Sequence, residues 1–202
     1  MQNETKAGRR RQILYSAKRV FSEKGFHNAS VSDIIDQVGI ARGTFYLYFT
    51  NKRDIFDNLL DNLLEELDKR IKPVDLTEGS PEPLDQIKDN IRRVLELVIK
   101  EPELIEILLH HSAGLDQRSA EAVRTFYDRV LRLIERSLEH GIRMGLVRPC
   151  NIHIVASCIL GTVKEVADWL TARDEEPPPI DVLVEEIVRY GLSGIFAQPV
   201  DT

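Results

Sequence analysis

The spacing of apolar residues restricts the fold of this chain more than any other feature, because it repeats almost everywhere with the period of an α-helix. The stripe from Val31 to Val38, for example, has apolar residues at i, i+3, i+4 and i+7, which places them on one face of a helix. Comparable stripes run through residues 13–21, 55–67, 84–99, 104–109, 123–142, 152–170 and 180–196. Together with a short segment near residues 42–48, they predict an all-α fold of about nine helices.

Two segments depart from the simple one-sided stripe. Residues 152–170 are apolar nearly all round, which is typical of a helix that is buried on most sides. The side chains of residues 45–49 favour a strand as much as a helix. A single strand in a helical chain would have no partner for its backbone hydrogen bonds, so we expect a helix with Phe45 and Phe49 facing inward.

Glycines, prolines and one capping pair mark the expected helix limits. Gly25 and Gly39 should each end a helix, since glycine readily takes the left-handed conformation that follows many helices. Ser30 precedes an apolar stripe and Asp33 follows three residues later, which predicts a capping box at the start of that helix. Residues 73–83, which read PVDLTEGSPEP, form the clearest linker.

The composition indicates an ordinary globular protein in a reducing compartment. The 202 residues are enough for one large or two small domains, with 43% hydrophobic and 30% charged residues. The two cysteines, Cys150 and Cys158, are too few for a disulfide framework and lack the spacing of a metal site. The N-terminus has no apolar signal region, and no uninterrupted apolar run reaches the length of a membrane span. We therefore expect a cytoplasmic protein.

Charge is distributed unevenly along the chain. Residues 1–52 contain nine Lys or Arg and four Asp or Glu, a balance of +5, whereas residues 53–202 have a balance of −11, giving the net charge of −6. A basic head on an acidic body indicates a head that meets a polyanion such as a nucleic acid.

The basic head contains the pattern of a helix-turn-helix: a helix over residues 30–38, a turn at residues 39–41 and a short helix over residues 42–48. Arg42 can bind a guanine edge in the major groove. The hydroxyls of Thr44, Tyr46 and Tyr48 and the ammonium of Lys52 suit phosphate contacts. Residues 9–11, three arginines, are expected to form a flexible arm that reaches the neighbouring backbone or minor groove. On these grounds alone, a purely structural helical hairpin stays an alternative.

The residues of this basic head also match a known family. Residues 13–56 read ILYSAKRVFSEKGFHNASVSDIIDQVGIARGTFYLYFTNKRDIF. This segment resembles the DNA-binding head of the tetracycline-repressor (TetR) family of one-component regulators. Two departures are Tyr48, where the family often has His, and Ile35, where it often has Ala. Tyr48 alters one expected contact with the DNA backbone.

The resemblance implies an all-α regulator, usually a repressor, that binds a palindromic operator as a homodimer and responds to a small molecule. It implies a DNA-binding helix-turn-helix domain over residues 1–52, a connecting helix over residues 53–72, and a ligand-binding and dimerisation domain over residues 73–202. The residues that it places against DNA are Ser30, Ser32, Ala41, Arg42, Gly43, Thr44, Tyr46, Tyr48 and Lys52.

The acidic body has few polar residues that point to a site. Residues 152–169 and 180–196 hold more apolar side chains than one core face can use, which favours a four-helix dimer interface, although the first could simply be a central core helix. A ligand pocket is expected among the helices of residues 84–170. The candidate lining residues are His110, Phe126, Tyr127, Cys158 and Trp169. Each has an alternative: the histidine and the Phe126–Tyr127 pair could belong to the core, and Trp169 could pack at the dimer interface.

Sequence patterns that would indicate an enzyme are missing. The chain has no GxGxxG after a strand, no P-loop, no HExxH and no CxxC. Glu106 and His110 are four residues apart but have no companion metal ligands. We therefore expect no enzyme activity, metal or cofactor. The alternative function is a helical small-molecule-binding or scaffold protein that does not bind DNA.

Overall fold

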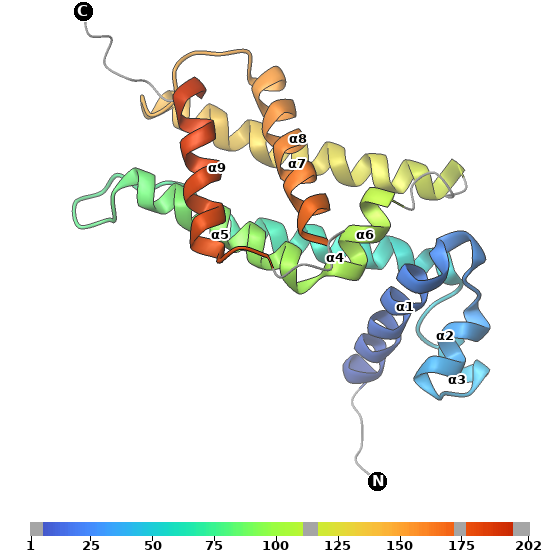
Figure 1. The fold of residues 1–202 in the computed structure, drawn as a ribbon. Coiled ribbons are helices and arrows are strands. Elements are labelled where there is room, and N and C mark those ends of the chain that lie inside the picture. Colours follow the sequence, from blue (N-terminus) through green and yellow to red (C-terminus); the bar gives the residue numbers. More distant parts are fainter. Residues whose placement is uncertain (1–5, 111–116, 172–176, 196–202) are drawn as a thin grey trace, which may run out of the picture. The chain divides into compact units, whose positions relative to one another are not determined.

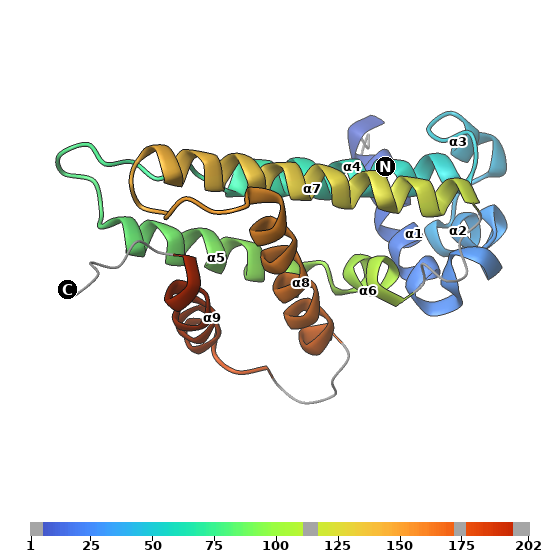
Figure 2. The same ribbon diagram turned by 90° about the horizontal axis from the view of Figure 1, so that it is seen from above.

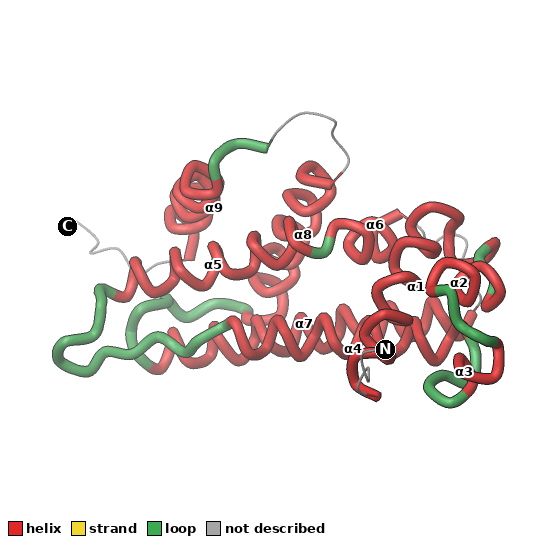
Figure 3. The backbone as a smooth tube through the Cα atoms, turned by 90° about the horizontal axis from the view of Figure 1, so that it is seen from below, coloured by secondary structure: helices red, strands yellow, loops and turns green. Residues whose placement is uncertain are grey.

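The computed structural model describes residues 6–110, 117–171 and 177–195, and every regular element within these ranges is a helix (Figures 1 and 3). The predicted all-α fold is confirmed. The helices are α1 (Lys6–Asn28), α2 (Val31–Val38), α3 (Arg42–Tyr46), α4 (Lys52–Arg70), α5 (Pro83–Lys100), α6 (Pro102–His110), α7 (Gln117–Arg143), α8 (Ile152–Thr171) and α9 (Ile180–Ile195).

These helices pack into two compact units that do not follow chain order. The first combines Met1–Leu64 with Glu101–Phe126, and the second combines Glu65–Lys100 with Tyr127–Thr202. α4 and α7 therefore each contribute to both units. The two units are defined by compact packing and not by function. The predicted domain limits at residues 52 and 73 therefore stay predictions.

Aromatic side chains form the centre of the first unit. Phe21 and Phe26 of α1 pack against Phe56 of α4 in edge-to-face and tilted arrangements, with ring centroids 5.1 Å apart for Phe21 and Phe26 and 4.9 Å apart for Phe26 and Phe56. Phe45 and Phe49 are buried as predicted, and their rings lie 6.3 Å apart. Each such buried ring stabilises the head by about 1.5–3 kcal/mol relative to exposure, so the inward aromatics decide how α1 to α4 pack.

The helix α6 packs against α1 within the same unit (Figure 2). Ile107 is fully buried there, like Ile13 and Ala17 of α1. Two polar contacts accompany this apolar packing. Lys18 pairs with Glu101, the residue before α6, and the Ser22 hydroxyl donates to Glu106 Oε2 over 2.6 Å. A segment far along the chain is thus part of the same compact unit as the head helices.

The second unit has its described core between α5 and α9 (Figure 2). Leu95 of α5 packs with Leu183, Val184 and Val188 of α9. At the surface of this contact, Lys88 pairs with Glu185 and Arg92 pairs with Asp181, each over 2.7 Å. The described part of the apolar stripe predicted for residues 180–196 therefore faces α5.

The helix α8 is much less buried than its composition predicts. Only Ala156 and Ala167 of its 20 residues are buried, and the Ile154 side chain is 59% exposed. Near its end, Val166, Trp169 and Leu170 are partly buried against the α5–α9 core. The prediction of burial on most sides is wrong for a single chain, because the neighbouring helices cover only part of the surface of α8.

Candidate nucleic-acid interface

The interface begins at the corner where α1 turns into α2. Gly25 has φ 73° and ψ 149°, so the regular helix stops there as predicted and residues 26–28 make a separate turn. Ser30 then caps α2: its hydroxyl oxygen accepts from the Asp33 N–H over 3.1 Å, and the Ser30 N–H donates to Asp33 Oδ2 over 2.8 Å. The predicted capping box is therefore confirmed.

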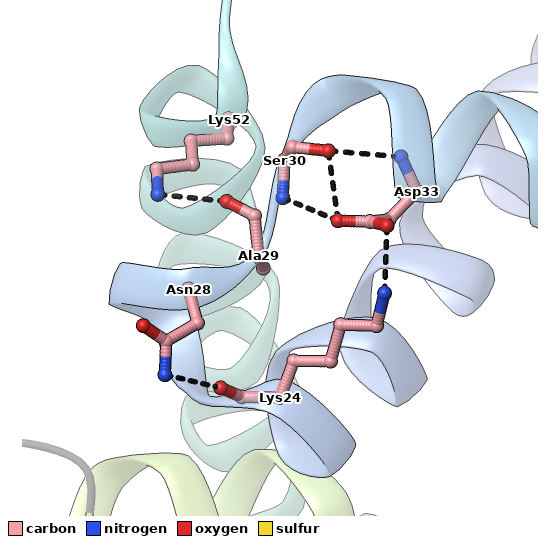
Figure 4. A network of polar contacts seen from close by, with 6 residues as sticks. All are labelled: Lys24, Asn28, Ala29, Ser30, Asp33 and Lys52. Atoms are coloured by element: carbon pink, nitrogen blue, oxygen red, sulfur yellow. Dashed lines mark hydrogen bonds and ion pairs between the residues drawn. The ribbon is translucent and has the colours of Figure 1, made fainter.

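Asp33 also ties α2 to the end of α1. Lys24 Nζ lies 2.6 Å from Asp33 Oδ1, while the opposite carboxylate oxygen accepts from Ser30 (Figure 4). The Lys24 side chain, followed by the Ser30 hydroxyl and N–H, stabilises the charged form and lowers the pKa of Asp33 to about 2. The corner is thus held by a carboxylate that stays ionised well below neutral pH.

The turn between α2 and α3 has the expected left-handed glycine. Gly39 has φ 70° and ψ 42°, and its N–H donates to Ile35 O over 2.9 Å. The Ile40 N–H donates to the same carbonyl over 3.3 Å. Both bonds satisfy one carbonyl in the last turn of α2, and they direct the chain into α3 at a defined angle.

The predicted short helix is present, and it ends slightly earlier than expected. α3 covers Arg42–Tyr46, and Leu47 and Tyr48 continue as a turn in which the Tyr48 N–H donates to Phe45 O over 2.9 Å. Five residues cannot form a stable helix alone, so the buried Phe45 and Phe49 must hold it. The strand alternative for this segment is excluded.

One side of α3 presents most of the residues that the sequence assigns to DNA. Arg42 is exposed, and its guanidinium carbon lies 5.9 Å from the ring centroid of the exposed Tyr46. Thr44 and Tyr48 are half-buried. The small residues Ala41 and Gly43 and, on α2, Ser32 are exposed. This surface can offer one forked cation, several hydroxyls and a closely approachable backbone to a duplex.

Two of the assigned residues have their polar groups engaged inside the head. The Ser30 hydroxyl takes part in the capping box, where it also donates to Asp33 Oδ2 over 2.7 Å. The Lys52 ammonium donates to the carbonyl oxygens of Phe26, His27 and Ala29. This arrangement gives no support to the phosphate contact predicted for Lys52.

The three N-terminal arginines do not form the flexible arm expected from the sequence. Residues 9–11 belong to α1, which begins at Lys6. Arg10 donates to Asn58 Oδ1, and its guanidinium lies 5.2 Å from the Phe49 ring centroid. Anchoring to α4 and to the aromatic core keeps this part of the chain helical, so the prediction of an arm at these residues is wrong.

Leu47 is an interface candidate that sequence reasoning missed. Its side chain is 74% exposed directly after α3, beside Tyr46. The signal was present, since Leu47 lies two positions from both Phe45 and Phe49 and a helical turn directs it away from them. An exposed leucine suits contact with an apolar group such as a thymine methyl.

The residues predicted to line an effector pocket have varied surroundings. Phe126 is buried, whereas Cys158 is exposed. Burial raises the pKa of Tyr127 to about 12, and Lys164 Nζ lies 4.4 Å above its ring. Trp169 packs against the α5–α9 core. The side chain of His110 lies outside the described residues, and this set of pocket residues stays a prediction.

The described parts of the chain also show neither a cluster of metal ligands nor a membrane-spanning helix. They contain no group of three or more His, Cys, Asp or Glu placed to hold a metal ion. In the same residues, none of the helices is both long and apolar enough to cross a bilayer.

Comparison with known proteins gives matches in both parts of the chain. Residues 13–59 match the family described as bacterial regulatory proteins, tetR family, and residues 80–195 match the tetracyclin repressor-like C-terminal domain. The HTH-type transcriptional regulator YhgD of Bacillus subtilis is 25% identical, covering 92% of this chain and 97% of that protein.

Solved structures show the same fold. A TetR-family transcriptional regulator from Syntrophomonas wolfei superposes with a TM-score of 0.79 at 26% identity, covering 98% of this chain and all of that one. The regulator FadR from Bacillus subtilis, in complex with stearoyl-CoA, gives a TM-score of 0.73 at 23% identity, covering 92% and 98%.

Proposed function

This chain belongs to the tetR family of bacterial regulatory proteins, and on that premise we propose that it represses transcription by binding a palindromic operator as a homodimer. As a member of that family it is a DNA-binding transcriptional regulator. The observation that carries the proposal is the short helix α3, which the buried Phe45 and Phe49 hold so that Arg42 and Tyr46 are exposed. Regulators of chromosomal genes work in the cytoplasm, where we place the protein.

The DNA contacts proposed for this head come from α3 and the start of α2. The Arg42 guanidinium has the geometry for a bidentate bond to guanine O6 and N7. Tyr46, Tyr48 and Thr44 contribute hydroxyls to phosphate oxygens, and Ser32 lies exposed near the start of α2. Ala41 and Gly43 have small side chains that let the backbone of α3 approach the groove.

A second copy of the chain supplies the symmetry that a palindromic operator requires. α8 and α9 expose apolar side chains, with Ile154 on α8 and Val182 and Tyr190 on α9. Two helices from each subunit would bury these side chains in a four-helix bundle. The two copies of α3 then enter successive major grooves about 34–36 Å apart.

A small molecule bound among the body helices would release the operator by favouring a conformation with the wrong spacing of the two heads. The relative that holds stearoyl-CoA makes acyl-coenzyme A thioesters the first effectors to test. Titration of the protein–operator complex with a series of acyl-CoA chain lengths, with free coenzyme A as the control, measures this response.

Selection of duplexes from a random-sequence pool tests the proposed function. The protein should enrich a palindrome whose half-site centres lie about one helical turn apart. An unenriched pool at low salt and without added ligand would instead favour the alternative, a helical small-molecule-binding or scaffold protein that does not bind DNA.

A further inference from the structure

Lys52 is the first residue of α4, and its ammonium reaches back to the end of α1. Its Nζ lies 2.8 Å from Phe26 O, 2.9 Å from His27 O and 2.8 Å from Ala29 O, and Figure 4 draws the last of these bonds. Lysine has three N–H donors, and each is matched here by a backbone carbonyl. The three carbonyls form what we call the carbonyl seat of Lys52.

The carbonyl seat is a favourable place for a cation. Carbonyls at the end of a helix have no partner within it and carry partial negative charge. The ammonium also lies 4.8 Å from the centroid of the Phe26 ring, which attracts cations. A DNA phosphate could bind this ammonium only by displacing bonds that already satisfy it.

The position of the seat connects it to α3. The chain reaches Lys52 directly after the segment that follows α3, residues 47–51. α3 is therefore held on one side by the turn at Gly39 and on the other by the start of α4. Because α3 is too short to keep its own orientation, both attachments determine the direction in which Arg42 points.

We propose that Lys52 is a positioning residue: by occupying the carbonyl seat it fixes the start of α4 against the α1–α2 corner and so orients α3 for the operator, without contacting DNA. This inference rests on the DNA-binding function proposed above. It assigns the lysine a role in sequence recognition that a phosphate contact could not have, since phosphates are the same in every sequence.

The test compares Lys52→Met with Arg19→Met, which removes one positive charge from an exposed site of α1 in the same unit. Affinity is measured from low to moderate salt for two probes, the duplex selected by the wild-type protein and random-sequence duplex. We expect Lys52→Met to bind the selected duplex about tenfold more weakly than Arg19→Met, as for the loss of a charged hydrogen-bonded contact. Its affinity for random duplex and its salt slope should equal those of Arg19→Met.

Three other results would overturn the proposal. Equal weakening for both probes, with a salt slope lower by about 0.9 than in the control, would identify a phosphate contact. A lower thermal midpoint and a smaller active fraction, with an unchanged ratio of the two affinities, would identify a purely structural role. Affinities for both probes equal to those of Arg19→Met would show that the seat does not affect recognition.

Lys52→Arg keeps the test decisive if the methionine variant folds poorly. The guanidinium keeps the charge and binds phosphate well, but its five N–H donors lie in one plane and cannot reproduce the three-fold arrangement around the lysine nitrogen. We expect it to lose affinity for the selected duplex as Lys52→Met does, and full operator affinity in this folded variant would contradict the proposal. If the wild-type protein selects no duplex at all, the proposed function fails instead, which is a separate result.

Discussion

The guanidinium carbon of Arg42 lies 5.9 Å from the centroid of the Tyr46 ring, one helical turn further along α3. The aromatic ring limits the conformations of a long side chain that is otherwise exposed. A pre-ordered guanidinium loses less conformational entropy when it binds a base edge than a mobile one does. The pair therefore makes Arg42 the best candidate in the head for a base contact.

Replacing Arg42 with Ala should weaken operator binding by ~1–3 kcal/mol and relax the sequence preference at one base pair of each half-site. The reason is the loss of a bidentate bond that only one base pair accepts. Competition with a set of operators, each altered at one position, measures both effects. Arg42→Lys is the control for charge and should not restore the preference; an unchanged preference in the alanine variant would exclude a base contact.

The ionised Asp33 should make the stability of the head depend on pH in the acid range. Its pKa is about 2 in the folded chain against an ordinary value of 3.8. The stabilisation is therefore fully present above about pH 4 and is lost as the pH falls towards 2. Asp33→Asn should lower the free energy of unfolding at pH 7, and the difference from wild type should shrink between pH 4 and pH 2. Denaturant unfolding followed by circular dichroism at each pH measures this, and a pH-independent difference would contradict it.

The ion pair between Lys18 and Glu101 should couple α6 to α1 energetically. The side chains are only 13% and 22% exposed, so each charge depends on the other. A double-mutant cycle with Lys18→Met and Glu101→Gln should give a coupling energy of about 1 kcal/mol in the free energy of unfolding. The surface pair of Arg19 and Glu23 is the control and should give less. Additive effects at Lys18 and Glu101 would show that the contact contributes nothing to the packing of α6.

At this interface, the features predicted correctly from the sequence are those that depend on residues close together in the chain. The capping box of Ser30 and Asp33 spans three residues, and the left-handed turn at Gly39 depends on one residue and its neighbours. The carbonyl seat of Lys52 could not be predicted in this way. Its acceptors are backbone oxygens 23 to 26 residues earlier, and they are brought there by the packing of aromatic rings.

The same limit explains the error at α8. Hydrophobic composition reports how much apolar surface a helix has, and it does not say which surface covers it. Ile152, Ile154 and Val155 are apolar, and yet the packing within one chain leaves Ile154 exposed. The dimer proposed above would supply the missing cover, and a sequence pattern alone cannot distinguish burial by a second copy from burial in the core of the same chain.

Replacing Ile154 with Glu should therefore disrupt the proposed dimer. A charge in an apolar helix bundle has no partner and is costly to desolvate, so the dimer dissociation constant should rise at least about tenfold. Sedimentation at several concentrations measures it, and operator affinity should fall in parallel. Leu76→Glu changes another exposed apolar residue, in the loop before α5, and should leave both unchanged. An intact dimer in the Ile154 variant would place the interface elsewhere.

Gly39 and Gly43 should respond in opposite ways to the same substitution. A Cβ at either position would meet no atom within 4 Å, so neither glycine is needed for space inside the chain. Gly39 has φ +70°, and Gly39→Ala should destabilise the head by about 1 kcal/mol through backbone strain. Gly43 has no such angle and lies within α3, so Gly43→Ala should keep or raise stability by about 0.5–1 kcal/mol.

The operator affinity of Gly43→Ala decides what that glycine is for. Nothing within the chain requires a missing side chain there, whereas the floor of a major groove lying against α3 would. We expect Gly43→Ala to fold at least as stably as wild type and to bind the selected duplex clearly more weakly, measured by fluorescence anisotropy beside its thermal midpoint. A stable variant with full affinity would mean that this part of α3 stays away from the bases, and the small residues at its start would then have no role in recognition.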